Sequence, residues 1–422
     1  MPKNRILLAL ALCLGAAACA RPDDRLVVRS QGVREELDDS LVKAITARVD
    51  TLNTDLIKFS STAIARLDTA SVGVVSVTAQ FELGSVGELM LTLQSDSTAD
   101  DNAELWTFVD SADASTRVVL ARVNSTFSGQ VWKDGELYRI EQAAGDYYLL
   151  RKVEQGGRLP EKAPRRPTAN EKAKAKTRPR ADARASDECK TPALITLLVG
   201  VPASDTAALG GFSRVKADVS VVVKTINSAL YENHLAHRVR LLPVVVTHGE
   251  TNALLDTALT RLEDPDDKQF DDLLQERDRL HADVTVLWVR RATDACGLAY
   301  VIRDFASESS LALITVDAIC AFEGLSLAHE LGHTLGVEHD RANATAAAPW
   351  LPFAFGFQMP SKKGRDIMAY DCPSGCPRVP MYSSPRAMWK GEPLGVSSAD
   401  PVHSADAASA IAASACSVAK FR

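Results

Sequence analysis

The amino-acid sequence predicts an α+β fold. A β-rich N-terminal domain precedes a domain with a twisted mixed β-sheet and a helix that carries the candidate site. Strand patterns dominate residues 20–155, and strand and helix patterns then alternate without a regular βαβ repeat. A basic, proline-containing stretch separates the two parts. With 422 residues, the chain is also longer than one typical domain.

The composition is that of an ordinary globular protein. Hydrophobic residues make up 46% of the chain and charged residues 24%, and the formal net charge is −6 at pH 7. This charge balance gives no indication of a basic surface, so we predict no nucleic-acid partner. We take a monomer as the default oligomeric state.

Residues 1–19 have the pattern of a secretory signal, in which a short basic region precedes the apolar stretch 6–14. Small residues before Cys19 resemble a bacterial lipoprotein processing site, which makes Cys19 a lipidation candidate and implies a lipid anchor to a membrane. Ordinary cleavage after Ala18 or Ala20 is the alternative. We therefore expect an exported protein, either in the bacterial cell envelope (lipid-anchored or periplasmic) or secreted.

Residues 20–155 are expected to form the β-rich domain. The stretch 72–83 is rich in Val and Thr, and Asp134-Gly135 lies between two apolar runs, as in a hairpin turn. A helical segment at 38–67 is expected before these strands. The region 26–152 contains neither His nor Cys, so no metal site is expected there.

Residues 156–188 form a basic segment rich in Lys, Arg, Pro and Ala. This composition cannot bury enough apolar surface to order itself, so it predicts a linker that trypsin-like proteases can cut. A solvated spacer without any processing role is the alternative.

Residues 189–422 should form the second domain. In order, the patterns predict a strand at 194–201, a helix at 215–235, a strand at 240–247, helical segments within 254–280, strands at 284–289, 298–302 and 311–316, and a helix at 325–335.

The predicted helix at 325–335 contains the residues that carry chemistry. His329 and His333 are four residues apart, so their imidazoles lie on one helical face and can reach one ion. Glu330 lies beside them, where a carboxylate can take a proton from metal-bound water.

Gly336 allows the helix to end, because glycine tolerates the left-handed conformation that turns the chain. The turn can bring His339 back as a third ligand beside His329 and His333. Three neutral nitrogens leave a fourth position open, which is the arrangement of a catalytic Zn²⁺ ion.

The pattern His-Glu-x-x-His-x-x-Gly-x-x-His, followed by Asp340, resembles the metzincin zinc metallopeptidases, in particular their reprolysin (adamalysin)-like branch. The resemblance implies a zincin-like catalytic domain and an endopeptidase that hydrolyses a protein or peptide substrate through a zinc-bound water, with Glu330 as general base. It also implies that the β-rich domain is a pro-domain, so that the enzyme is made as a proprotein.

Two other readings differ from an endopeptidase in class. One is a noncatalytic zinc-bearing binding protein on a peptidase fold, which the presence of Glu330 disfavours. The other is a lipid-anchored protein whose β-rich domain is the main binding module.

Downstream residues extend the resemblance. Met368, in Asp366-Ile367-Met368-Ala369-Tyr370, matches the Met-turn that lies beneath the metal ligands of metzincins. Tyr370 departs from the reprolysin pattern and occupies a position typical of astacins and serralysins, so it is either a catalytic phenol or a packed core residue. The implied substrate-binding edge strand consists of Gly297, Leu298, Ala299, Tyr300 and Val301.

Six cysteines follow the signal-like stretch, and an even number in an exported chain predicts disulfides. By position, the expected pairs are Cys296 with Cys320, Cys372 with Cys376, and Cys189 with Cys416. Other pairings stay open at this point. Cys189 could alternatively bind the zinc ion in a latent form.

Overall fold

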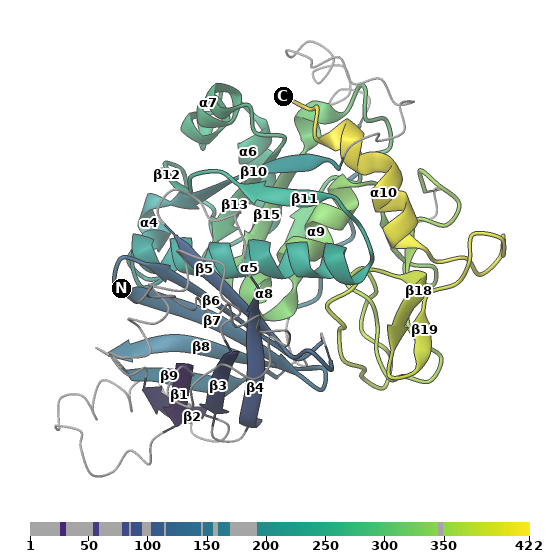
Figure 1. The fold of residues 1–422 in the computed structure, drawn as a ribbon. Helices are drawn as coiled ribbons and strands as arrows, with labels where there is room; N and C mark the ends of the chain where they lie inside the picture. Colours follow the sequence, from purple (N-terminus) through teal and green to yellow (C-terminus); the bar gives the residue numbers. More distant parts are fainter. Residues whose placement is uncertain are drawn as a thin grey trace, which may run out of the picture.

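The computed structural model describes residues 26–30, 54–58, 78–83, 86–94, 103–113, 115–144, 147–154, 159–168, 192–344 and 349–422 (Figure 1). The signal-like stretch with Cys19, and Cys189, lie outside these ranges. Among the described helices, none combines the length and apolar character needed to cross a membrane.

The described strands of the N-terminal domain form a closed barrel in the order β1-β2-β9-β8-β7-β6-β5-β4-β3. Neighbouring strands of the barrel are antiparallel, except that β1 and β3 pair in parallel. The strands are β1 (Leu26–Ser30), β2 (Thr54–Lys58), β3 (Thr78–Leu83), β4 (Gly87–Gln94), β5 (Glu104–Val109), β6 (Arg117–Val123), β7 (Thr126–Lys133), β8 (Glu136–Ala144) and β9 (Tyr147–Lys152). The β-rich prediction is met within the described residues, and Asp134-Gly135 forms the turn between β7 and β8.

The predicted helix at 38–67 is wrong at residues 54–58, because this part is strand β2, which pairs with β9. The other residues of that prediction lie outside the described ranges. A local pattern cannot reveal a partner strand that lies about ninety residues further along the chain. The stretch predicted at 72–83 is described only from Thr78, where β3 begins.

The C-terminal domain is built on a mixed sheet in the order β11-β10-β13-β15-β14, with β12 also paired to β10. All pairs are parallel except β14 with β15, so β14 is an antiparallel edge strand. The strands are β10 (Leu194–Pro202), β11 (Arg238–Leu241), β12 (Val245–Thr247), β13 (Val284–Val289), β14 (Gly297–Ala299) and β15 (Leu313–Asp317). The strand predicted at 240–247 is two strands, because Pro243 between them has no N–H to donate to the ladder.

Helices cover both faces of this sheet. Successive residues of β10 point to opposite faces of the sheet. Leu197 belongs to the core under α5, α9 and α10, whereas Leu198 belongs to the core under α6 and α7. The helices are α4 (Ala203–Thr206), α5 (Phe212–Glu232), α6 (Leu255–Glu263), α7 (Asp271–Leu280), η4 (Ser309–Leu311), α8 (Ala318–Gly324), α9 (Ser326–Thr334) and α10 (Ala407–Val418). Short strand pairs β16 (Glu338–Asp340) with β17 (Phe355–Gly356), and β18 (Ser384–Trp389) with β19 (Glu392–Leu394), follow the active helix.

The barrel rests on helix α5, which lies between it and the mixed sheet in Figure 1. Arg139 of the barrel is buried at this contact and pairs with Asp218 of α5 at 3.0 Å and with Glu323 of α8 at 3.0 Å. Buried charges require such partners, so this network fixes how the two domains meet.

The expectation that the basic segment makes no ordered contacts is not met at residues 159–168. Arg165 forms a parallel bridge with Tyr300, immediately after β14. The ordering interactions come from main-chain groups of the sheet edge and from ion pairs of the segment's charged side chains, and not from its own apolar side chains. The sequence-based expectation counted only apolar burial and therefore missed them.

Candidate active site

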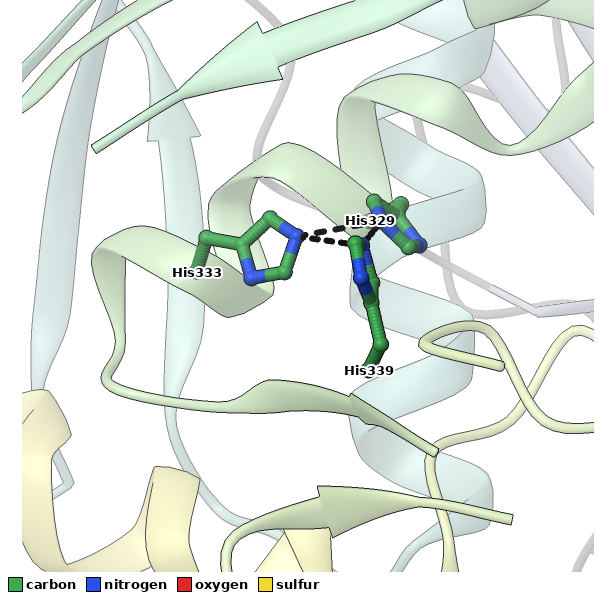
Figure 2. A group of neighbouring side chains, drawn as sticks. All are labelled: His329, His333 and His339. Atoms are coloured by element: carbon green, nitrogen blue, oxygen red, sulfur yellow. Dashed lines mark hydrogen bonds between the residues drawn. The ribbon is translucent and has the colours of Figure 1, made fainter. Parts of the chain in front are cut away.

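Helix α9 and the turn after it bring three histidines together, as Figure 2 shows. The Nε2 atoms of His329, His333 and His339 are each 3.1 Å from the other two. Gly336 ends the helix with φ of 85°, the left-handed conformation that the sequence predicted for it. All three side chains are fully buried, and they form the one candidate metal cluster found among the described residues.

The hydrogen bonds of the imidazoles show that the cluster suits a cation. His329 Nδ1 lies 2.8 Å from the carbonyl oxygen of Ile367, and His333 Nδ1 lies 2.7 Å from that of Val337. A carbonyl only accepts, so each Nδ1 carries the proton and each Nε2 presents a lone pair. Burial also lowers the pKa of all three imidazoles, which keeps them neutral. Lone pairs this close repel one another unless a metal ion lies between them.

Glu330 is fully buried, and neither of its carboxylate oxygens has a hydrogen-bond partner among the described residues. Burial raises the pKa of this carboxyl well above its ordinary value, and the nearby Glu161 carboxylate adds to the effect. A buried carboxylate without a structural partner is costly to a fold, which is typical of a catalytic group.

The edge strand fits closely around this carboxylate. A Cβ atom placed on Gly297 would overlap Oε1 of Glu330 and lie 2.7 Å from its Cγ. Only glycine therefore allows β14 to approach Glu330 at this point.

The turn that contains Met368 lies beneath the metal-binding helix. A Cβ atom on Gly332 would overlap the Met368 sulfur, so side chain and helix are in direct contact. Asp366 holds the turn, because one carboxylate oxygen accepts from the N–H groups of Phe357 and Ala369, both at 2.9 Å. The position is the one that the Met-turn resemblance implies.

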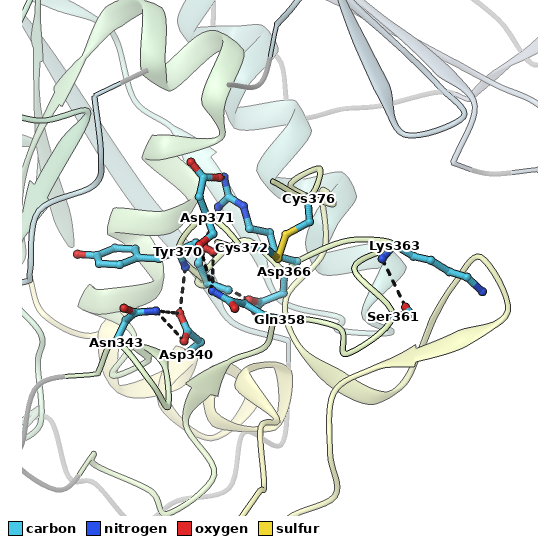
Figure 3. Close-up of a disulfide and its surroundings, with 12 residues drawn as sticks. Asp340, Asn343, Gln358, Ser361, Lys363, Asp366, Tyr370, Asp371, Cys372 and Cys376 are labelled. Carbon is cyan, nitrogen blue, oxygen red and sulfur yellow. Dashed lines mark hydrogen bonds and ion pairs between the residues drawn. A yellow bond between two sulfur atoms is a disulfide. The ribbon is translucent and has the colours of Figure 1, made fainter. Parts of the chain in front are cut away.

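Tyr370 lies at the side of the cluster. Its ring centroid is 4.0 Å from that of His339, and its N–H donates to Asp340 Oδ2 at 3.1 Å (Figure 3). Asp340 also accepts from Asn343, so it anchors the chain after the third histidine. Tyr370 is only partly buried and lines the cavity described below, so both roles proposed for its phenol remain predictions.

A cavity of about 260 Å³ opens beside the cluster, and its lining includes Tyr370, Arg378, Ser326 and Glu161. Glu161 accepts from Arg378 Nη1 at 2.8 Å and from Ser326 Oγ at 2.7 Å. No role was predicted from the sequence for these three residues individually. Arg378 and Glu161 are 217 positions apart, and neither belongs to a motif.

Two disulfides frame this region. Cys296–Cys320 links the start of β14 to helix α8, and Cys372–Cys376 closes a loop after Tyr370 (Figure 3). Both are pairs expected from position. Cys416 is also disulfide-bonded. Its pairing with Cys189, which lies outside the described residues, stays a prediction.

Comparison with known proteins gives related peptidases. A family model described as metallo-peptidase family M12 (Reprolysin_5) matches residues 191–383. Two peptidyl-Asp metalloendopeptidases of Stenotrophomonas maltophilia are similar. The strain R551-3 protein is 31% identical over 289 residues (68% of this chain, 67% of that protein), and the strain K279a protein is 30% identical over 292 (67% and 66%). The alignments thus span about two thirds of each relative. A solved structure, metalloproteinase-II from Bacteroides fragilis, is also similar. The alignment covers 75% of this chain and 90% of the Bacteroides fragilis chain, with 12% identity and a TM-score of 0.46.

Proposed function

Because this chain belongs to metallopeptidase family M12 and is a metalloendopeptidase, we propose that it hydrolyses peptide bonds with one Zn²⁺ ion and with Glu330 as general base. The ion would be held by His329, His333 and His339. The observation that carries this proposal is the set of three mutually facing Nε2 atoms at 3.1 Å. Three nitrogen ligands with a fourth position left open are typical of catalytic zinc.

Bound zinc supplies a Lewis acid, which polarises a carbonyl group and lowers the pKa of water to about 7. The protein supplies the proton transfer. Glu330 follows His329 directly in the helix, and its unpartnered carboxylate can take the proton of the attacking water and later give it to the leaving amine.

The substrate is proposed to contain an acidic residue at the cleavage site. The curated relatives are named peptidyl-Asp metalloendopeptidases, which is a statement about those proteins. In this chain the support is Arg378, a buried guanidinium in the cavity beside the metal cluster. Guanidinium and carboxylate groups form strong charge-assisted hydrogen bonds.

Export as a proprotein belongs to the same proposal. Disulfides such as Cys296–Cys320 and Cys372–Cys376 persist mainly in oxidising compartments outside the cytosol. The β-rich barrel is proposed to be the pro-domain. The support is that residues 159–168, which follow the barrel in the chain, lie along the edge strand of the peptidase domain.

The test compares the wild-type chain with Glu330→Gln, using zinc analysis and cleavage of a peptide that contains one Asp. We expect one zinc ion per chain in both proteins. We also expect cleavage by the wild type to be sensitive to chelator and to fall at least about 10³-fold in the variant, since general bases contribute about 10²–10⁴-fold.

Glu392→Gln is the matched control and should keep full activity, because Glu392 is a partly exposed residue of strand β19 that pairs with Lys363. Equal cleavage by Glu330→Gln would reject the assigned base. One zinc ion without cleavage in the wild type, across peptides with and without Asp, would favour the noncatalytic binding protein instead.

A further inference from the structure

Residues 159–168 occupy the free edge of β14. The N–H group of Arg165 donates to the carbonyl of Ala299 at 2.8 Å, and the N–H group of Val301 donates to the carbonyl of Arg165 at 3.0 Å. Further back along the chain, Cys296 N–H donates to the carbonyl of Pro160 at 3.0 Å. An edge strand offers one outward row of N–H and C=O groups. A substrate strand therefore cannot add to β14 while this segment is in place.

Glu161 of this segment is buried in the cavity beside the metal cluster and is only 6% exposed. Its Oε1 accepts from Arg378 Nη1 at 2.8 Å and from Ser326 Oγ at 2.7 Å. Its Oε2 has no hydrogen-bond partner among the described residues. The carboxylate thus contacts a cation and a hydroxyl of the peptidase domain, and among the described residues it makes no hydrogen bond within its own segment.

Arg378 needs a counter-charge at this position. The residue is 8% exposed, and its Nη1 also donates to the carbonyl of Gly324 at 2.7 Å. The neighbouring Arg365, bridged to it through the backbone, pairs with Asp371, so the Asp371 carboxylate is already engaged with another guanidinium. A buried guanidinium that loses its carboxylate is strongly destabilised. When the segment leaves, an incoming acidic side chain restores the pair, whereas an amide does not.

We propose that Arg378 and Ser326 form the pocket that binds an acidic side chain of the substrate, and that Glu161 occupies this pocket as an internal substitute for that side chain. The enzyme is inhibited while Glu161 and the paired segment stay in the cleft, and the wild type cleaves substrate through the fraction of molecules in which the segment has left the cleft. This inference rests on the proposed peptidase function, and it names the residues that select the substrate and the residue that competes with it.

Binding measurements on the full, zinc-loaded chain test the proposal separately from catalysis. Glu330→Ala serves as an inactive background, and the probes are two peptides that differ only in one Asp or Asn within an Ala-Gly sequence. In this background, adding Glu161→Gln should tighten binding of the Asp peptide by about tenfold or more, because the competing carboxylate is gone. The same protein should bind the Asn peptide about tenfold more weakly than the Asp peptide.

Adding Arg378→Gln should remove the difference between the two peptides. Ser326→Ala, a smaller change, should reduce it and decides the case if Arg378→Gln does not fold. Glu154→Gln and Arg386→Gln, at exposed positions, are the matched controls and should change neither affinity.

Two results would overturn the proposal. One is no gain of affinity with Glu161→Gln. The other is an Asp preference that survives in folded Arg378→Gln or, if that variant does not fold, an Asp preference that is not reduced in Ser326→Ala. Failure of the zinc-loaded wild type to cleave any peptide would instead reject the proposed function. The two failures can be told apart, because the peptide affinities are measured in the inactive Glu330→Ala background and do not depend on turnover.

Discussion

At the scale of single residues, the site depends on how closely backbone and side chains approach Glu330. The carboxylate has no hydrogen-bond partner among the described residues, so its position is set by packing against Gly297 and by its place in helix α9. Sequence spacing alone predicted His329, His333 and Glu330, because one helical turn places them regardless of the rest of the fold. The requirement for glycine at 297 could not be predicted, because it arises from contact between two distant elements.

Gly297→Ala tests this close approach. The added methyl group would lie 2.7 Å from Glu330 Cγ, so the carboxylate must move. Displacement of a catalytic group by about 1 Å can cost about 10²-fold in rate, and we expect a loss of kcat/KM of that size.

Zinc content should be unchanged in Gly297→Ala, because the atoms nearest to the added methyl group belong to Glu330 and not to the histidines. Full activity in a folded Gly297→Ala protein would contradict the close packing. Loss of zinc would show that the substitution disturbs the metal ligands instead.

At the scale of elements, local patterns predicted most helices and strands, and long-range pairing explains the errors. The active helix was expected at 325–335 and is observed as α9 (Ser326–Thr334). Strand β2 (Thr54–Lys58) was mistaken for part of a helix, because its pairing with β9 is not visible in its own sequence. Residues 159–168 were taken for an unordered linker for the same reason, since β14 supplies their hydrogen bonds.

Arg165→Pro tests the pairing of the segment with β14. Proline has no N–H, so it removes the bond to the Ala299 carbonyl, and the side-chain ion pair with Asp256 is lost as well. We expect the full chain to cleave an Asp-containing peptide several-fold faster, measured as an initial rate before any change in its intact mass. The reason is that loosening of residues 159–168 exposes the free edge of β14, to which the substrate strand would add.

Arg165→Ala is the matched control, because it removes the side-chain contacts and keeps the N–H group. It should raise the rate less than Arg165→Pro does. A rate for Arg165→Pro equal to that of the wild type would show that the segment does not limit access to the cleft.

At the scale of the whole molecule, a buried ionic network joins the barrel to the peptidase domain. Arg139 has Asp218 and Glu323 within 3.0 Å and Glu141 at 3.1 Å, and these carboxylates hold the pKa of its guanidinium above the ordinary range. The sequence predicted two domains, but this contact was not foreseen. Its partners come from strands and helices that are far apart in the chain and carry no shared pattern.

Arg139→Ala should destabilise the protein strongly. The change removes the buried guanidinium that Asp218, Glu323 and Glu141 share, and these carboxylates keep Arg214 or Arg151 as a partner. We therefore expect a cost of about 2–3 kcal/mol, below the roughly 3–5 kcal/mol typical of a buried charge left fully unpaired. We expect a clear fall in the urea midpoint of the unfolding transition. Lys152→Ala is the control, because Lys152 pairs with Glu136 in an exposed position on the same barrel and should contribute less than about 1 kcal/mol. Equal effects of the two substitutions would contradict a structural role for the network.

The central claim is that His329, His333 and His339 hold one zinc ion, and X-ray absorption at the zinc edge of the full chain tests it most directly. The account predicts one zinc ion per chain, surrounded by imidazole nitrogens at about 2.0–2.1 Å, and loss of this signal in His333→Ala. Sulfur ligands at about 2.3 Å, or a chain that retains no zinc after dialysis against zinc-free buffer, would contradict it.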